Sequence, residues 1–298
     1  MLSADQVTAY RRDGYLKIEN AVGEEELRTL QRVTGELIEC SRELTESDER
    51  FDLDEGHSAD NPRLTRIKIP HHQHEAFAET LRSEHMLGYF RSLLGANVTL
   101  LTSKLNTKAP GGGAAVEWHQ DWAFYPHTNA DVLAFGLMLE DVDRENGPLM
   151  VIPGSHRGPV LDHHRDGVFC GAVDPDDPDF HREEAIALTG RAGDMTVHHA
   201  RLLHGSAPNL SDRARLILFF EACAADAWPL MGSSAYFNRL SQPAMWEDLR
   251  ERMVCGEPAL EPRIEVNPVR LPLPPAPDAG SIFKLQRTGG ARSAFTAG

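Results

Sequence analysis

The chain has 298 residues, of which 41% are hydrophobic and 25% charged, and 30 Lys and Arg against 45 Asp and Glu give a formal net charge of −15. This composition is typical of a soluble globular protein. The acidity disfavours a nucleic-acid-binding protein, which needs a basic face for phosphates, and a protein that docks on anionic lipid. No secretory signal and no apolar run of ~18 residues is visible. Four scattered cysteines without a C-x-x-C pair indicate reduced thiols, so we expect a cytoplasmic protein.

Residues 1–97 are predicted to form a mainly helical part. Apolar residues at spacings of three and four predict an amphipathic helix over 24–38 and a second one over 77–94. Between them, residues 64–69 alternate between apolar and polar as in a strand.

Residues 98–225 are predicted to form the core, in which short strands alternate with Gly- and Pro-rich turns. This texture favours antiparallel sheets in a sandwich or barrel over a parallel α/β sheet. The Asp- and Pro-rich stretch 171–184 is predicted to be a long loop. Residues 226–298 form a C-terminal extension, and no linker separates the three parts, so we expect a single domain. The clearest strands are 98–105, 132–139, 149–152, 194–197 and 215–221.

The segment 117–122 reads Glu-Trp-His-Gln-Asp-Trp and places His119 and Asp121 two residues apart. In a strand such residues point to the same face. A third ligand can come from a distant strand, and His204 in Leu-Leu-His-Gly-Ser supplies one. Two His and one carboxylate leave open positions on an octahedral ion, as in non-haem Fe(II) oxygenases. An H-x-D pair alone is common, however, and fits a pair without metal equally well.

An arginine near the start of the apolar strand that follows His204 is a candidate to bind an acidic co-substrate. Arg215 lies eleven positions after His204 at the start of an apolar strand. A buried guanidinium needs an anion, and its fork matches a carboxylate. A dicarboxylate such as 2-oxoglutarate meets this need, with one end on the metal. Arg213 shares the strand face, so the pattern leaves both arginines open, and both also fit a cap on the acidic turn at Asp212. The histidine pair 198–199 lacks the following Gly-Ser and the spacing to Arg215, so His204 is preferred.

Longer motifs surround these residues. They read W-H-Q-D-W-A-F-Y-P from residue 118, D-V-L-A-F-G-L-M-L-E-D-V-D-R-E-N-G-P-L-M-V-I-P-G-S-H from residue 131, and H-G-S-A-P-N from residue 204. Over roughly residues 2–223 the chain resembles the phytanoyl-CoA dioxygenase family. The resemblance implies a mainly β protein, with a double-stranded β-helix core and flanking helices. It also implies Fe(II), 2-oxoglutarate and O2 as the reacting partners.

The resemblance further implies roles for individual residues. His119, Asp121 and His204 are the implied iron ligands and catalytic residues, and Arg215 is the implied anchor of the 2-oxoglutarate carboxylate. One branch of the family replaces the ligand carboxylate with a small residue and binds halide there. Because Asp121 is present, hydroxylation is favoured over halogenation.

Further co-substrate contacts are implied by position. Gln120 and Ser206 match family residues that touch 2-oxoglutarate. Lys68 is similar to a family lysine at that pocket, with Arg66 on the same strand face as its rival. Four residues are candidates to close the pocket from the C-terminal side or to serve packing alone: Trp228, Met231, Tyr236 and Phe237.

The predicted function is hydroxylation of a small organic molecule, with decarboxylation of 2-oxoglutarate to succinate and CO2. Desaturation, cyclisation or epimerisation of a natural-product intermediate is the alternative, and a non-catalytic binding barrel is a more distant one. A CoA thioester is polyanionic, and no Lys/Arg cluster near the expected mouth stands out to receive it. The sequence therefore favours a free small molecule over an acyl-CoA and leaves the oligomeric state open.

Overall fold

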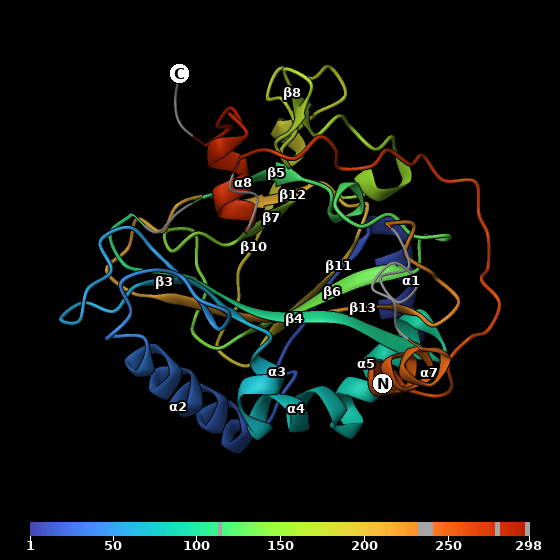
Figure 1. Cartoon of the computed structure of the whole chain (residues 1–298), viewed down its shortest axis with the longest axis horizontal. Helices are drawn as coiled ribbons and strands as arrows, with labels where there is room; N and C mark the ends of the chain where they lie inside the picture. Colours follow the sequence, from blue (N-terminus) through green and yellow to red (C-terminus); the bar gives the residue numbers. More distant parts are fainter. Residues whose placement is uncertain (113–114, 232–240, 278–280, 296–298) are drawn as a thin grey trace.

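The structure, a computed structural model of the chain, describes residues 1–112, 115–231, 241–277 and 281–295 (Figure 1). Two antiparallel sheets lie one above the other, and helices pack below the larger sheet. The molecule is therefore mainly β with flanking helices, as predicted. Among the described helices, none combines the length and apolar character that crossing a membrane requires.

The larger sheet has eight described strands. Its central strands β6 (Val132–Met138) and β13 (Arg215–Ala224) are buried along their whole length, because one face packs on helices and the other faces the smaller sheet. On β6, Phe135 packs toward the helices, whereas Ala134 faces the interior between the sheets. The strand order is β1 (Tyr15–Ile18), β11 (Met195–His199), β6 (Val132–Met138), β13 (Arg215–Ala224), β4 (Val98–Lys108), β3 (Leu64–Lys68) and β2 (Phe51–Leu53), with β14 (Met253–Cys255) pairing with β4.

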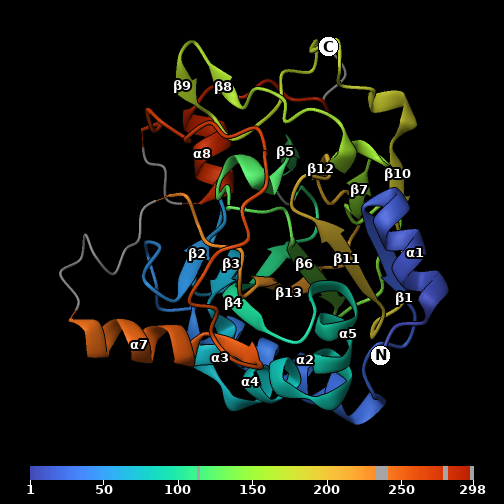
Figure 2. The ribbon, with the colours of Figure 1, turned by 90° about the vertical axis from the view of Figure 1, so that its right-hand side faces the viewer.

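The outer face of the larger sheet is covered by α2 (Glu24–Cys40), α4 (Glu75–Arg82) and α5 (Glu84–Leu94) (Figures 1 and 2). The prediction of one helix over 77–94 is wrong. Ser83 adopts an extended conformation and accepts a hydrogen bond from the amide of Met86, so it ends α4 and caps α5. Two further helices in this part of the chain are α1 (Ala4–Asp13) and α3 (Pro70–Gln73).

The smaller sheet brings distant parts of the core together. Its order is β10 (Ile186–Leu188), β7 (Leu149–Val151), β12 (His204–Ser206) and β5 (Val116–His119). His204 of β12 lies directly opposite His119 of β5 in the register. Because β5 is an edge strand, its outer side is open to contact with another segment. The connections contain the short pair β8 (His164–Arg165) and β9 (Val168–Phe169) and the 3-10 turns η1 (Asp121–Ala123), η2 (Ser155–Arg157) and η3 (Arg182–Glu184).

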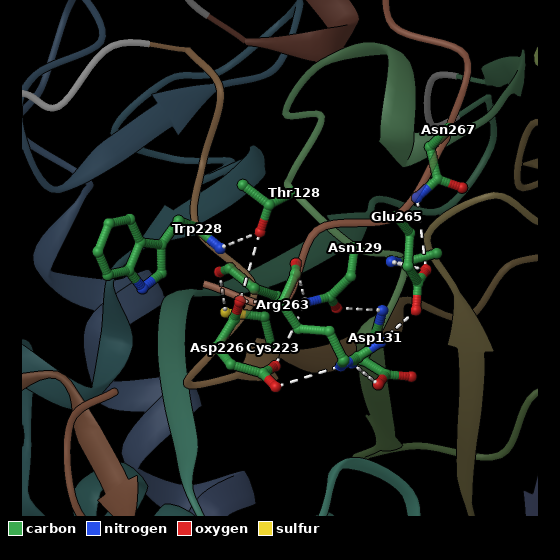
Figure 3. Close-up of polar contacts among 11 residues, drawn as sticks. Thr128, Asn129, Asp131, Cys223, Asp226, Trp228, Arg263, Glu265 and Asn267 are labelled. Carbon is green, nitrogen blue, oxygen red and sulfur yellow. Dashed lines mark hydrogen bonds and ion pairs between the residues drawn. The ribbon is translucent and has the colours of Figure 1, made fainter. Parts of the chain in front are cut away.

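The C-terminal extension runs around the outside and returns to the smaller sheet (Figures 1 and 2). After α7 (Gln242–Glu251) and β14, an extended stretch crosses the loops at one end of the sheets. There Arg263 contacts the carboxylates of Asp131, Asp226 and Glu265 (Figure 3). The chain then reaches α8 (Ile282–Thr288), which packs beside the edge strand β5.

Candidate active site

Two imidazoles and one carboxylate meet between the two sheets. His119 ends β5, His204 begins β12, and Asp121 begins the turn η1 that follows β5. The Nε2 atoms of His119 and His204 lie 3.6 and 3.8 Å from Oδ1 of Asp121. Each side chain belongs to a buried residue, and one ligand atom from each lies within 4.8 Å of the others. The three residues that the sequence grouped are therefore brought together.

Backbone carbonyls determine which nitrogen each imidazole presents. Nδ1 of His119 lies 2.8 Å from the carbonyl oxygen of Glu117, and Nδ1 of His204 lies 2.9 Å from that of Leu202. Because Nδ1 must carry the proton to donate these bonds, Nε2 keeps a lone pair directed toward Asp121. This is the tautomer that a metal ligand needs.

The electrostatics of the cluster favour a metal ligand set. Burial raises the pKa of Asp121, but nearby groups outweigh burial and hold this pKa well below its usual value; they belong to His204, His119, His198 and Lys104. Burial, together with the neighbouring histidines, lowers the pKa of His204 well below its usual value. The carboxylate of Asp121 is therefore ionised at neutral pH, and a carboxylate among buried imidazoles suits a divalent metal.

A buried guanidinium faces the same cavity. Arg215 is 3% exposed and lines the cavity together with the three residues above. Among the described residues, no acidic side chain pairs with it, and its Nε has no hydrogen-bond partner. Burial lowers the pKa of Arg215 to about 10. The rival Arg213 lies instead at the surface, in contact with Asp143. An unpaired cation in a buried site is costly unless an anion binds there, so Arg215 is the arginine suited to a carboxylate.

Lys108 lies opposite Arg215 in the register of β4 and β13. Its Nζ donates a hydrogen bond of 3.0 Å to the carbonyl oxygen of Ser206 and also contacts that of Ala207. Burial first, and Arg215 second, lower the pKa of Lys108 well below its usual value. Lys108 was not singled out from the sequence, although polar residues at every second position of β4 were a usable signal.

A second polar wall lines the cavity further along the same strands. Lys104 of β4 contacts the carboxylate of Glu221 of β13, and both line the cavity beside His198. Nε2 of His198 lies 3.4 Å from Oδ2 of Asp121. Burial first, then the carboxylates of Asp121 and Glu221, raise the pKa of Tyr125 well above its usual value. The sequence interpretation identified neither Lys104 nor Glu221 as a site residue.

The lysine predicted on β3 lies elsewhere. Nζ of Lys68 donates a 2.6 Å hydrogen bond to the carbonyl oxygen of Asp48 and lies 2.9 Å from Oδ1 of Asp52. Nε of the rival Arg66 lies 3.9 Å from Oδ2 of Asp52. Neither cation lines the cavity, because β4 separates β3 from the strand of Arg215. The geometry therefore gives no support to the predicted contact between Lys68 and the co-substrate.

Of the two residues predicted to touch 2-oxoglutarate, Ser206 lines the cavity and Gln120 does not. The amide of Gln120 is fully used by backbone groups: Nε2 donates to the carbonyl oxygens of Pro159 and Arg201 at 3.1 and 2.8 Å, and Oε1 accepts from the N–H of Leu161 at 2.9 Å. Because its extended backbone points it away from the ligands, Gln120 holds the neighbouring loop and does not line the cavity. The predicted co-substrate contact of Gln120 is not supported, whereas Ser206 does line the cavity.

The predicted closing residues are also accounted for. Trp228 and Met231 are 39% and 37% exposed and do not line the cavity. Tyr236 and Phe237 lie outside the described residues. Among the described residues of the C-terminal extension, Ile282 of α8 lines the cavity, and the sequence interpretation missed it.

Two imidazoles, a carboxylate and a buried arginine between antiparallel sheets define a non-haem iron oxygenase that takes a dicarboxylate co-substrate. A profile of the family "Phytanoyl-CoA dioxygenase (PhyH)" matches residues 10–217. The chain belongs to this family.

Relatives with known names agree with the class. A probable alpha-ketoglutarate-dependent hypophosphite dioxygenase of Stutzerimonas stutzeri is 36% identical over 288 residues, which cover 95% of this chain and 97% of the relative. An L-proline trans-4-hydroxylase of Streptomyces griseoviridis is 32% identical, covering 72% and 84%. The crystal structure of EctD from S. alaskensis with bound Fe is 27% identical, covers 75% of this chain and 77% of that one, and has a TM-score of 0.64. The protein is a dioxygenase that depends on iron and 2-oxoglutarate.

Proposed function

We propose that His119, Asp121 and His204 bind Fe(II), and that Arg215 binds the distal carboxylate of 2-oxoglutarate. In this proposal the two facing sheets form a double-stranded β-helix within a single domain. The observation that carries the assignment is the unpaired, buried guanidinium of Arg215 in the cavity of the three ligands. A guanidinium binds a carboxylate through two parallel hydrogen bonds, and the 2-oxo acid end of the co-substrate suits the metal.

Groups around Arg215 support the same orientation of the co-substrate. Ser206 and Asn106 line the cavity, and the hydroxyl of Ser206 and the amide nitrogen of Asn106 are donors that can bind a carboxylate. Lys108 holds the backbone at Ser206 through the hydrogen bond to its carbonyl oxygen, and it lies opposite Arg215. These residues lie where a bound dicarboxylate would need polar partners.

When bound, iron with O2 and 2-oxoglutarate supplies the oxidising chemistry, which yields succinate, CO2 and an oxygenated substrate. The chain's own part is to bind, to orient and to exclude water. The Nδ1 hydrogen bonds hold His119 and His204 in the ligating tautomer. Burial of all three ligands keeps bulk water away from the reacting groups.

The substrate class follows from the second polar wall. With the co-substrate at Arg215, the substrate must lie beside Lys104, Glu221 and His198. Nδ1 of His198 is buried without a hydrogen-bond partner, and burying such groups is costly unless a ligand satisfies them. This wall favours a small hydrophilic compound over an acyl-CoA. The relative of matching length is named for hypophosphite, a small anion of this kind, and another is named for proline.

The test measures coupled succinate release. Purified protein with Fe(II), ascorbate and 2-oxoglutarate is offered hypophosphite, L-proline, ectoine and a straight-chain acyl-CoA in parallel. We expect one of the three hydrophilic compounds to raise succinate formation, with oxygenated product in equal amount. Stimulation by the acyl-CoA alone would contradict the substrate class. Product analysis also separates hydroxylation from desaturation, cyclisation and epimerisation.

A further inference from the structure

The C-terminal segment 281–295 contacts the strand that carries His119. This segment lies beyond the residues that match the family profile, which end at 217. Gln286 of α8 is 5% exposed and makes three hydrogen bonds. Its Oε1 accepts from the N–H of Glu117 at 2.9 Å, and its Nε2 donates to the carbonyl oxygens of Glu117 and Gly171 at 3.2 and 2.9 Å.

These bonds satisfy the open side of an edge strand. Among the described strands, β5 has a partner only on the side of β12, so the N–H and C=O of Glu117 on its other side need partners when buried. The carboxamide of Gln286 supplies both, in the manner of a paired strand. The carbonyl oxygen of Glu117 is also the acceptor for Nδ1 of His119, at 2.8 Å. One carbonyl therefore joins Gln286 to the orientation of an iron ligand.

Other residues of the segment 281–295 also contact the strands that carry His119 and His204. The N–H of Ala294 donates to Oε2 of Glu117 at 2.8 Å. The ring of Phe295 stacks on Trp118 of β5, with centroids 6.0 Å apart and planes at 15°. A Cβ placed on Gly205, the residue after His204, would lie 3.3 Å from Phe295. The segment thus contacts both strands that carry histidine ligands.

The same helix also forms part of the cavity wall. Ile282, in the first turn of α8, lines the cavity together with His119 and His204. The helix is held to the body of the protein by Leu285, which packs among Ala123, Phe169 and Ala276. Simple surface packing does not require a buried glutamine that pairs with both backbone groups of one residue.

We propose that the C-terminal segment completes the active site: Gln286 is a positioning residue for the iron ligand His119, and Ile282 closes the cavity. The proposal rests on the assignment of His119 as an iron ligand. Partners that orient a ligating histidine typically contribute about 10- to 100-fold to metal affinity. Gln286 acts one bond further away through Glu117, so we expect the lower end, about 10-fold.

The test compares Gln286→Met, which keeps the volume and loses the hydrogen bonds, with Arg287→Ala on the same helix. Arg287 pairs with Glu55 at the exposed surface, so its removal controls for changes in α8 itself. Two quantities are measured: amide hydrogen exchange of the 116–119 peptide in metal-free protein, and the Fe(II) dissociation constant under anaerobic conditions with 2-oxoglutarate. We expect Gln286→Met to speed exchange and weaken Fe(II) binding about 10-fold, and Arg287→Ala to change neither.

Folded Gln286→Met protein with wild-type exchange and wild-type Fe(II) affinity would overturn the proposal. If Gln286→Met does not fold, Phe295→Leu replaces it, with the same expected direction and a smaller change, and no change would again refute the proposal. Failure of wild-type protein to bind Fe(II) would contradict the proposed function instead. The exchange measurement does not need iron, so it still decides whether Gln286 holds β5.

Discussion

Replacement of Arg215 by methionine tests the co-substrate site, because the change keeps an unbranched apolar stem and removes the charged guanidinium. Two charge-assisted hydrogen bonds to a carboxylate contribute about 1.5–3 kcal/mol each, and loss of one partner of a buried pair costs about 2–5 kcal/mol. The two estimates overlap at a binding free energy of about 3–5 kcal/mol. We therefore expect 2-oxoglutarate to bind Arg215→Met roughly 150- to 5,000-fold more weakly.

Without 2-oxoglutarate, Arg215→Met should stabilise the folded protein, although it weakens co-substrate binding. Burial lowers the pKa of Arg215 to about 10, so keeping this guanidinium charged without an anion costs about 3 kcal/mol. Arg215→Met removes that cost, and the free energy of unfolding without 2-oxoglutarate should not fall and should rise by as much as about 3 kcal/mol. 2-Oxoglutarate should then no longer raise Tm.

Anaerobic titration of the Fe(II) protein with 2-oxoglutarate measures the affinity, and thermal unfolding with and without 2-oxoglutarate measures the stabilisation. Arg213→Met is the matched control, since the ion pair of Arg213 with Asp143 is largely exposed and exposed ion pairs contribute little to stability. Near wild-type affinity in Arg215→Met, or a large loss in Arg213→Met, would refute the assignment of the anchor.

Three further predictions concern other parts of the site. Lys68→Ala should change the KM for 2-oxoglutarate less than about twofold, because the ammonium of Lys68 is already paired with Asp52. A tenfold rise in KM would show that Lys68 contacts the co-substrate after all. Burial lowers the pKa of His163 to about 3, and its Nε2 accepts a hydrogen bond from the backbone N–H of Gln120. Because an unfolded histidine takes up a proton below pH ~6.5, stability should fall as pH drops from there toward 3. Urea unfolding of metal-free protein measures this effect as the fall in the free energy of unfolding between pH 7 and pH 5. That fall should be about 2 kcal/mol smaller in His163→Gln than in wild type; equal falls would show that His163 does not titrate this way. Ile282→Ala should raise succinate formation without substrate product about threefold by admitting water, and unchanged coupling would argue against a wall at Ile282.

The cluster of His119, Asp121 and His204 was predictable because it depends on local geometry. Extended backbone continues from β5 through Gln120, so the alternation that groups His119 with Asp121 holds although Asp121 itself lies in a turn. His204 was found from its neighbouring Gly-Ser and its spacing to Arg215. The short strands of the core were visible for a similar reason, since their turns are rich in Gly and Pro.

One prediction that is wrong, the single helix, and two that the geometry does not support, Lys68 and Gln120, have different physical causes. Lys68 was placed on the correct strand, but the order of strands, which local sequence does not specify, put β4 between it and Arg215. Gln120 was assigned by position in a motif, although alternation directs it away from the ligands. The prediction of one helix over 77–94 overlooked Ser83. The apolar pattern continues across Ser83, but its side chain caps a new helix there.

The role of the C-terminal segment was out of reach of sequence reasoning. Gln286 and Glu117 are 169 positions apart, and no pattern in either segment indicates that they meet. The contact depends on how the extension is fixed along its path, including the acidic contacts of Arg263 (Figure 3). Only the tertiary arrangement shows that α8 reaches the active site.

The central claim is that His119, Asp121 and His204 hold one Fe(II) beside 2-oxoglutarate. Anaerobic Fe(II) titration in the presence of 2-oxoglutarate, followed by the weak visible charge-transfer band, tests it most directly. We predict saturation at one iron per chain in wild type and in the exposed-loop control His181→Ala, and loss of the band in His119→Ala and Asp121→Ala. A band that persists in both ligand variants, or that never forms in wild type, would contradict the account.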